Sequence, residues 1–126
     1  MAGTKTILIV DDDRDLAESI RAALQRQGYQ TVVGHTGFEA LQLIGDRRPD
    51  LVILDLAMPR MGGYPVLEHY RDNPDAPPFI ALNSSDGSRH KAYAELLGAI
   101  DYLRKPFVLE RLLESVQKVL PNAAAN

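Results

Sequence analysis

The chain has 126 residues, of which 45% are apolar and 25% are charged, and its formal net charge is −3. These values are typical of a single globular domain, and an acidic balance without a basic run argues against nucleic-acid binding. With no cysteine, the chain can form neither disulfides nor thiolate zinc sites.

Short β-branched runs alternate with longer segments of helical period, which is the pattern of βα units around a parallel sheet. The first strand is expected at residues 7–10, a run too short for a signal-peptide core or a membrane span. We therefore expect a cytoplasmic protein. The first half continues with a helix that Gly28 can end, a strand at residues 31–33, a helix broken at Pro49 and a strand at residues 51–54. The expected apolar faces of these two helices are Leu16, Ile20, Ala23 and Leu24, then Phe38, Leu41 and Ile44.

The second half of the chain repeats this alternation. Its expected elements are, in order, a helix at residues 65–71, a strand at 79–82, a polar loop at 84–88, a helix containing residues 92–97 and ended by Gly98, and a strand at 100–103. A last helix has its apolar stripe at Leu109, Leu112, Leu113, Val116 and Leu120. We predict an α/β fold, a doubly wound five-stranded parallel sheet with five helices, in one domain over residues 1–120. Residues 121–126 would be a tail or the start of a linker.

Polar residues follow four of the five expected strands. Ligands of a doubly wound sheet bind at the carboxyl ends of its strands, so these residues should meet in one pocket. They are Asp11 and Asp12 after the first strand, Asp55 at the end of the third, Asn83 and Ser84 after the fourth, and Lys105 after the fifth.

Three clustered carboxylates without histidine or cysteine make a hard, oxygen-rich site that favours Mg²⁺ or Mn²⁺ over zinc. Magnesium keeps several waters and is usually completed by a substrate phosphate, so the site favours phosphoryl chemistry. Lys105 could then bind a phosphate oxygen. Asp55 is the best placed nucleophile, and its attack on phosphorus would give an acyl phosphate.

The strings ILIVDDD, PDLVILDLAMP and GAIDYLRKPF, with the spacing between them, resemble the receiver domain of two-component response regulators. The resemblance covers about residues 5–120 and implies a flavodoxin-like, CheY-like fold with strand order 2-1-3-4-5. It implies that a histidine kinase or histidine phosphotransfer protein phosphorylates Asp55. It also implies that Asp11, Asp12, Asp55 and the backbone carbonyl of Ala57 hold Mg²⁺.

The resemblance assigns roles to three further positions. Lys105 corresponds to the family's lysine, and the bond before Pro106 is expected to be cis. Tyr102 falls on the aromatic position whose rotamer reports phosphorylation to the surface. The output face of the family corresponds here to residues 89–120, which would contact a downstream protein partner. The implied function is a signalling switch and not an enzyme.

One position departs from the family pattern. Receivers usually carry threonine or serine at the end of the fourth strand, where this chain has Asn83. The amide of Asn83 could donate to a phosphoryl oxygen instead, or a one-residue slip could present Ser84. The missing hydroxyl also leaves room for a second hypothesis, a binding module that keeps the fold and switches without phosphate.

Other residues have simpler interpretations. Asp13 and Asp15 are expected to cap the helix that follows them. His35, His69 and His90 lack metal-ligand spacing and are expected at the surface. A haloacid dehalogenase-type phosphohydrolase is a remote alternative, because Asp11 to Asp13 contain that family's D-x-D. Asp15 stands where that motif expects threonine or valine, however, and a cap domain has no room.

Overall fold

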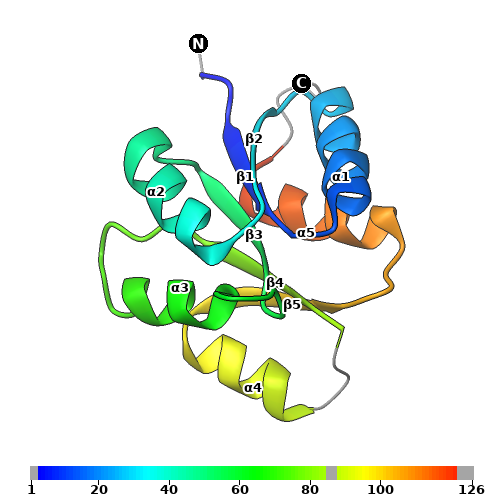
Figure 1. The fold of residues 1–126 in the computed structure, drawn as a ribbon. Coiled ribbons are helices and arrows are strands. Elements are labelled where there is room, and N and C mark those ends of the chain that lie inside the picture. The colour runs from blue at the N-terminus through cyan, green and yellow to red at the C-terminus, as the bar shows by residue number, and fades with distance from the viewer. Residues whose placement is uncertain (1–2, 85–87, 122–126) are drawn as a thin grey trace.

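The computed structural model describes residues 3–84 and 88–121, in which five strands and five helices alternate along the chain (Figure 1). The elements are β1 (Thr6–Val10), α1 (Arg14–Arg26), β2 (Gln30–Gly34), α2 (Gly37–Arg47), β3 (Leu51–Asp55), α3 (Gly63–Tyr70), β4 (Phe79–Asn83), α4 (Ser88–Leu96), β5 (Ala99–Arg104) and α5 (Leu109–Val119).

The five strands form one parallel sheet in the order β2-β1-β3-β4-β5, which confirms the predicted fold class. The first strand, β1, lies next to the edge strand β2, and the chain then returns past β1 to add β3, β4 and β5 on its other side. Val10 pairs with Leu54, and Asn83 pairs with Arg104. The strands therefore end close to a common line, and the residues after them share one edge.

Apolar side chains of the strands alternate between two buried layers, as the period of a β-strand requires. Helices α1 and α5 cover one face of the sheet, and α2, α3 and α4 cover the other (Figure 1). Both faces are therefore dry, which explains why β3 is apolar until Asp55. On the α1 and α5 face the strands contribute Ile7, Ile9, Leu51, Ile53, Ile80, Leu82 and Leu103, and on the other face Leu8, Val10, Val52, Leu54, Phe79, Ala81 and Ala99.

Helix α1 has the apolar face and the cap that its sequence predicts. Ile20 and Leu24 are fully buried, and Asp13 is the N-cap, its carboxylate accepting the Leu16 N–H at 3.1 Å. Asp15 lies in the first turn, where a negative charge suits the helix dipole. The helix ends before Gly28, whose φ of 95° is readily adopted only by glycine.

The predicted face of α2 is wrong at its first position. Phe38 is 63% exposed, and the buried residues of the helix are Gly37, Ala40 and Ile44. The cause is a close approach, because the Gly37 N–H donates to Met61 O at 2.9 Å and a Cβ on Gly37 would lie 2.7 Å from Met61 Cγ. With Gly37 against this loop, Phe38 is turned outward by one helical step of about 100°.

The start of α3 and the end of the predicted polar loop differ from the predicted bounds. Helix α3 begins at Gly63, two residues before Pro65, and Ser88, the last residue of the predicted loop, is the first residue of α4. Residues 85–87 of the predicted polar loop and residues 122–126 of the predicted tail lie outside the described residues. Within the described part of the chain, none of the helices has the length and hydropathy needed to cross a bilayer.

Candidate functional site

The three predicted carboxylates meet at the carboxyl edge of the sheet. Asp11 directly follows β1 and Asp55 is the last residue of β3, its neighbour in the sheet. Asp12 completes the group, and one carboxylate oxygen from each of the three lies within 4.8 Å of the others. Asp11 and Asp55 are buried, whereas Asp12 is exposed, so the cluster opens to solvent on one side.

Lys105 reaches this cluster from the end of β5. Its Nζ donates to Asp55 Oδ2 at 3.2 Å and forms an ion pair with Asp11 Oδ2 at 2.7 Å. The Lys105 backbone N–H donates to Asn83 O at 2.7 Å, and the Lys105–Pro106 bond is cis, as expected. These backbone contacts carry β5 past its last strand residue and direct the lysine inward.

The second carboxylate oxygens of Asp11 and Asp55 accept hydrogen bonds from backbone N–H groups. Asp11 Oδ1 accepts from the N–H of Asp13 at 2.9 Å, and Asp55 Oδ1 accepts from the N–H of Ala57 at 3.1 Å. Each carboxylate is thus oriented by the first residues of the loop that follows its own strand. The two loops fix which oxygens face the centre of the site.

Burial, together with the charge of Asp11, raises the pKa of Asp55 to about 6, against the lowering effects of the Ala57 N–H and the Lys105 ammonium. Burial lowers the pKa of Lys105, but its contacts with Asp11 and Asp55 outweigh that effect and raise it above the ordinary value. The lysine therefore stays charged while one ammonium faces three carboxylates. The site retains an excess of negative charge that a further cation would neutralise.

The donor set fits a hard divalent cation. All three side chains offer carboxylate oxygens, which Mg²⁺ prefers over nitrogen or sulfur ligands. Asp11 Oδ2 is buried, and the Lys105 ammonium lies 2.7 Å from it. One ammonium shared between Asp11 and Asp55 does not balance three carboxylates, so a further cation would be favourable there.

The end of β4 supplies Asn83 between the Asp55 and Lys105 strands. Asn83 is buried, and its Oδ1 has no hydrogen-bond partner among the described residues. Ser84, in contrast, is exposed and lines a cavity of about 440 Å³ with Asp13, Leu16, Lys105, Pro106 and Phe107. This cavity lies beside the Lys105 side chain, and Asp11, Asp12 and Asp55 are not among its lining residues.

Tyr102 lies on β5 and is half-buried. It packs against the apolar cluster on the face covered by α2, α3 and α4, together with Tyr64. Its backbone N–H donates to Asp101 Oδ1 at 2.8 Å, and Asp101 also binds Arg111 and Ser115 of α5. The tyrosine thus lies between the packed interior and the α4 and α5 surface.

His35 is a neighbour of the site that the sequence did not identify. The prediction of a surface role is wrong for this residue, because its ring is half-buried and its Nδ1 lies 2.9 Å from the backbone O of Asp11. One signal was available, since His35 directly follows β2, the strand beside β1. His69 and His90 are exposed, as expected.

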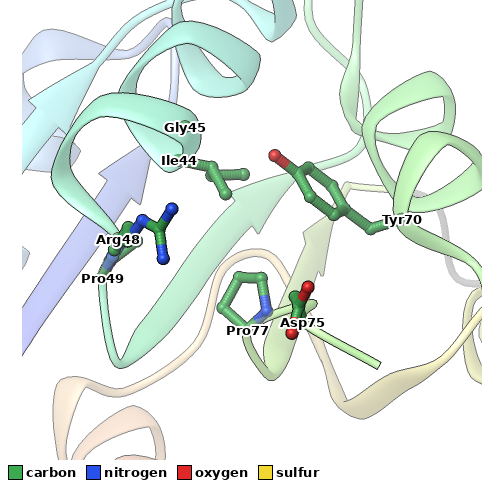
Figure 2. Close-up of a pocket in the computed structure, with 7 residues that line it drawn as sticks. All are labelled: Ile44, Gly45, Arg48, Pro49, Tyr70, Asp75 and Pro77. Atoms are coloured by element: carbon green, nitrogen blue, oxygen red, sulfur yellow. The ribbon is translucent and has the colours of Figure 1, made fainter. Parts of the chain in front are cut away.

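A second pocket lies at the opposite edge of the sheet. It has a volume of about 220 Å³ and is close to the amino ends of β3 and β4, where Pro49 and Pro77 line it (Figure 2). Figure 2 shows Arg48, Tyr70 and Asp75 around it. Ligands of such sheets bind at the carboxyl ends of the strands, so the carboxylate edge is the better candidate site.

Comparison with known proteins finds a family match and close sequence relatives. The family model described as the response regulator receiver domain matches residues 7–117. The chain is 41% identical over 114 residues to the response regulator MprA of Mycobacterium ulcerans (strain Agy99), and 42% identical over 114 residues to that of Mycobacterium sp. (strain KMS). Each alignment covers 90% of this chain, and 49% and 50% of the respective relative. The chain therefore spans about half the length of these curated relatives.

Solved structures of similar proteins share the fold. The chemotaxis response regulator CheY4 of Vibrio cholerae superposes with a TM-score of 0.84 at 30% identity, covering 94% of this chain and 100% of that one. A putative response regulator from Chloroflexus aurantiacus J-10-fl gives a TM-score of 0.85 at 34% identity, covering 94% of this chain and 98% of the other.

Proposed function

The chain belongs to the family of response regulator receiver domains, which are signalling modules, and from this premise we propose that Asp55 is its phosphoacceptor. The donor is a histidine kinase or a histidine phosphotransfer protein of a two-component system in the cytoplasm. The receiver domain comprises residues 1–120, with residues 121–126 as a tail or linker start. The observation that carries the proposal is that buried Asp55 contacts Lys105 inside a cluster of three carboxylates.

The chemistry is a transfer of the phosphoryl group to a carboxylate. An oxygen of Asp55 attacks phosphorus, and the new O–P bond forms as the P–N bond of the donor phosphohistidine breaks. The electron pair stays on the imidazole nitrogen, which takes a proton from water. The attacking carboxylate must be ionised, and a pKa of about 6 leaves Asp55 mostly ionised at neutral pH. Lys105 then binds a phosphoryl oxygen with its ammonium.

A divalent cation is part of this proposal. Asp11, Asp12, Asp55 and the backbone carbonyl of Ala57 would hold Mg²⁺, with Mn²⁺ as a substitute. When bound, the ion would neutralise the negative charge that the phosphoryl group brings to the carboxylates. The chain itself contributes the fixed directions of the Asp11 and Asp55 carboxylates, which the N–H groups of Asp13 and Ala57 hold in place.

The readout of phosphorylation is a change at the surface of α4, β5 and α5, within residues 89–120. A phosphoryl group on Asp55 offers acceptor oxygens to Lys105 and to the amide of Asn83, which is buried at the next strand end. Asn83 begins the connection to α4, so its movement changes the start of that helix. Tyr102 responds from β5, and a downstream protein partner binds the altered face.

Acetyl phosphate with Mg²⁺ tests the proposal directly. We expect the intact mass of the native chain to increase by one phosphoryl group, and the adduct to be absent from Asp55→Asn. Asp46→Asn is the matched control, because it makes the same substitution on an exposed carboxylate of α2. An adduct of equal yield in Asp55→Asn, or none in the native chain, would contradict the assignment.

Asn83 favours a second candidate, a binding module that keeps the fold without phosphorylation. Its amide lacks the hydroxyl that receivers usually place there. Beryllofluoride with Mg²⁺ separates the two functions, since a phospho-switch should show NMR shifts in α4 and β5 and a phosphate-independent module an unchanged spectrum. An Asn83→Thr variant should alter the lifetime of the acyl phosphate, and an identical lifetime would mean that Asn83 does not contact the phosphoryl group.

A further inference from the structure

His35 contacts the backbone of the acidic pair, Asp11 and Asp12, from the end of β2. Its ring Nδ1 lies 2.9 Å from the backbone O of Asp11, across 24 residues of sequence. A carbonyl oxygen can only accept a hydrogen bond, so Nδ1 carries the proton and donates it. The contact therefore fixes both the orientation of the ring and its tautomer.

The backbone of His35 is held at the start of α2. The His35 backbone N–H donates to Glu39 Oε1 at 3.2 Å, and the Glu39 N–H donates to the Oγ1 of Thr36, the N-cap of α2, at 3.1 Å. This reciprocal arrangement at the start of α2 resembles a capping box and fixes the direction in which the chain enters the helix. His35 thus reaches Asp11 from a rigid support.

The Asp11 carbonyl belongs to the peptide group that joins Asp11 to Asp12. On its other side, the Asp11 N–H donates to Gly34 O at 3.2 Å, so both backbone groups of Asp11 are bonded to consecutive residues at the end of β2. The orientation of this peptide plane sets the direction in which Asp12 leaves the backbone. Since Asp12 is exposed, backbone geometry matters more for it than for buried Asp11.

We propose that His35 is a positioning residue for the divalent-cation site, acting through the Asp11 carbonyl on the directions of the Asp11 and Asp12 carboxylates. The inference rests on the proposed function, which places Mg²⁺ at these carboxylates. Partners that orient metal ligands from behind commonly tune metal affinity, and here the partner holds the backbone of two ligands at once. His35 does not touch the phosphoryl group.

The test is the affinity of the unphosphorylated chain for Mg²⁺, measured by isothermal titration calorimetry. We expect His35→Ala to weaken binding roughly twofold to tenfold, the range that corresponds to one ordinary hydrogen bond. His35→Asn should recover most of the affinity, because its amide nitrogen occupies nearly the position of Nδ1 and can donate. His69→Ala is the matched control on an exposed histidine of α3, and its affinity should equal that of the native chain.

An independent readout does not depend on the variants folding. Nitrogen-15 NMR of the native imidazoles should show the His35 proton on Nδ1, unlike the Nε2 form that neutral exposed histidines prefer. A proton on Nε2 would overturn the inference, and so would equal Mg²⁺ affinities of native and His35→Ala chains. Affinity as weak in His35→Asn as in His35→Ala would also overturn it. In these cases the native chain still binds Mg²⁺, whereas failure of the native chain to bind would remove the proposed cation site itself.

Discussion

Helix α1 follows the end of β1, which carries Asp11 and Asp12, and α4 follows the end of β4, which carries Asn83. The two helices are attached to the sheet in different ways. Helix α1 follows the acidic pair, has a side-chain N-cap and buries Ala17, Ile20, Ala23 and Leu24. Helix α4 follows Asn83, and Ala94 is the one buried side chain among its described ones. The side of the site that carries Asp11 and Asp12 is thus followed by a helix held by apolar burial, whereas the side that carries Asn83 is followed by a helix with little of it.

Polar pairs replace part of this burial at α4. The Tyr64 hydroxyl of α3 lies 2.9 Å from His90 Nδ1, and the Tyr93 hydroxyl donates to Glu68 Oε2 at 2.8 Å. The rings of Tyr64 and Tyr93 pack with centroids 5.4 Å apart. Hydrogen bonds at an exposed surface exchange with water at little net cost, whereas buried apolar contacts do not. The difference suits a fixed ligand set beside a helix that can shift.

The largest expected effect comes from breaking the burial of α1. Ile20→Ala should lower the free energy of unfolding by about 3 kcal/mol, because it removes a fully buried side chain and leaves a cavity. Leu96→Ala on α4 should change it by less than about 0.5 kcal/mol, since Leu96 is 63% exposed. Urea unfolding followed by circular dichroism measures both, and equal losses would contradict the comparison.

The next largest effect concerns the excess negative charge at Asp55 and its influence on the free energy of unfolding. The pKa of Asp55 in the folded chain, about 6, lies above its ordinary value of 3.8. The folded chain therefore keeps a proton that the unfolded chain loses between these values, and the contribution of Asp55 to stability falls as pH rises through this window. Asp55→Asn removes the penalty and should stabilise the metal-free chain at pH 8 by on the order of 2 kcal/mol.

At pH 4 the two chains should differ much less, because Asp55 is then protonated in the folded chain. Adding Mg²⁺ at pH 8 should stabilise the native chain more than Asp55→Asn, since the ion offsets the same repulsion. Urea midpoints at both pH values, with and without Mg²⁺, give these differences. A native chain as stable as the variant in metal-free buffer at pH 8 would show that Asp55 carries no net penalty.

The smallest expected effect concerns the hydrogen bond that links α4 to α3 through Tyr93. Tyr93→Phe keeps the ring but removes the hydroxyl that donates to Glu68, so it should lower global stability by about 1 kcal/mol or less. Local opening of α4 should increase, with amide hydrogen exchange there up to about fivefold faster. Tyr70→Phe is the matched control on α3, outside the pairs with α4. Unchanged exchange in α4 would mean that the Tyr93 hydroxyl does not hold this helix.

The strands and the polar residues after them could be predicted from the sequence because both are local properties. A short apolar run with a carboxylate at its end identifies β1 and β3 without knowledge of their neighbours. Parallel pairing then brings these ends to one edge, so Asp11, Asp55 and Lys105 could be placed together although 94 positions (105 − 11) separate the first from the last. The close contacts of Lys105 with both carboxylates agree with that placement.

The start of α2 could not be predicted in the same way. Its buried face is set by the approach of Gly37 to Met61, and glycine contributes nothing to an apolar pattern. The apolar pattern alone therefore predicts Phe38 in the interior, whereas it is exposed. The same segment gives His35 its contact with Asp11, a contact that depends on where β2 ends relative to β1. Both errors arise from packing between segments, which hydrophobic period does not record.

The backbone bonds that continue the sheet past its strands have a consequence for insertions and deletions. Leu56 N–H donates to Leu82 O at 2.8 Å, and Lys105 N–H donates to Asn83 O at 2.7 Å. The pairing between strands therefore fixes the position of each site residue along its strand. Removing one residue from β3 would shift the later residues of that strand, Asp55 included, by about 3.3 Å and turn their side chains to the other face of the sheet. Insertions and deletions are expected to be tolerated in the exposed turn around residues 72–75 instead. This turn precedes β4, and a change in its length leaves the pairing of the strands, and so the positions of the site residues, unchanged.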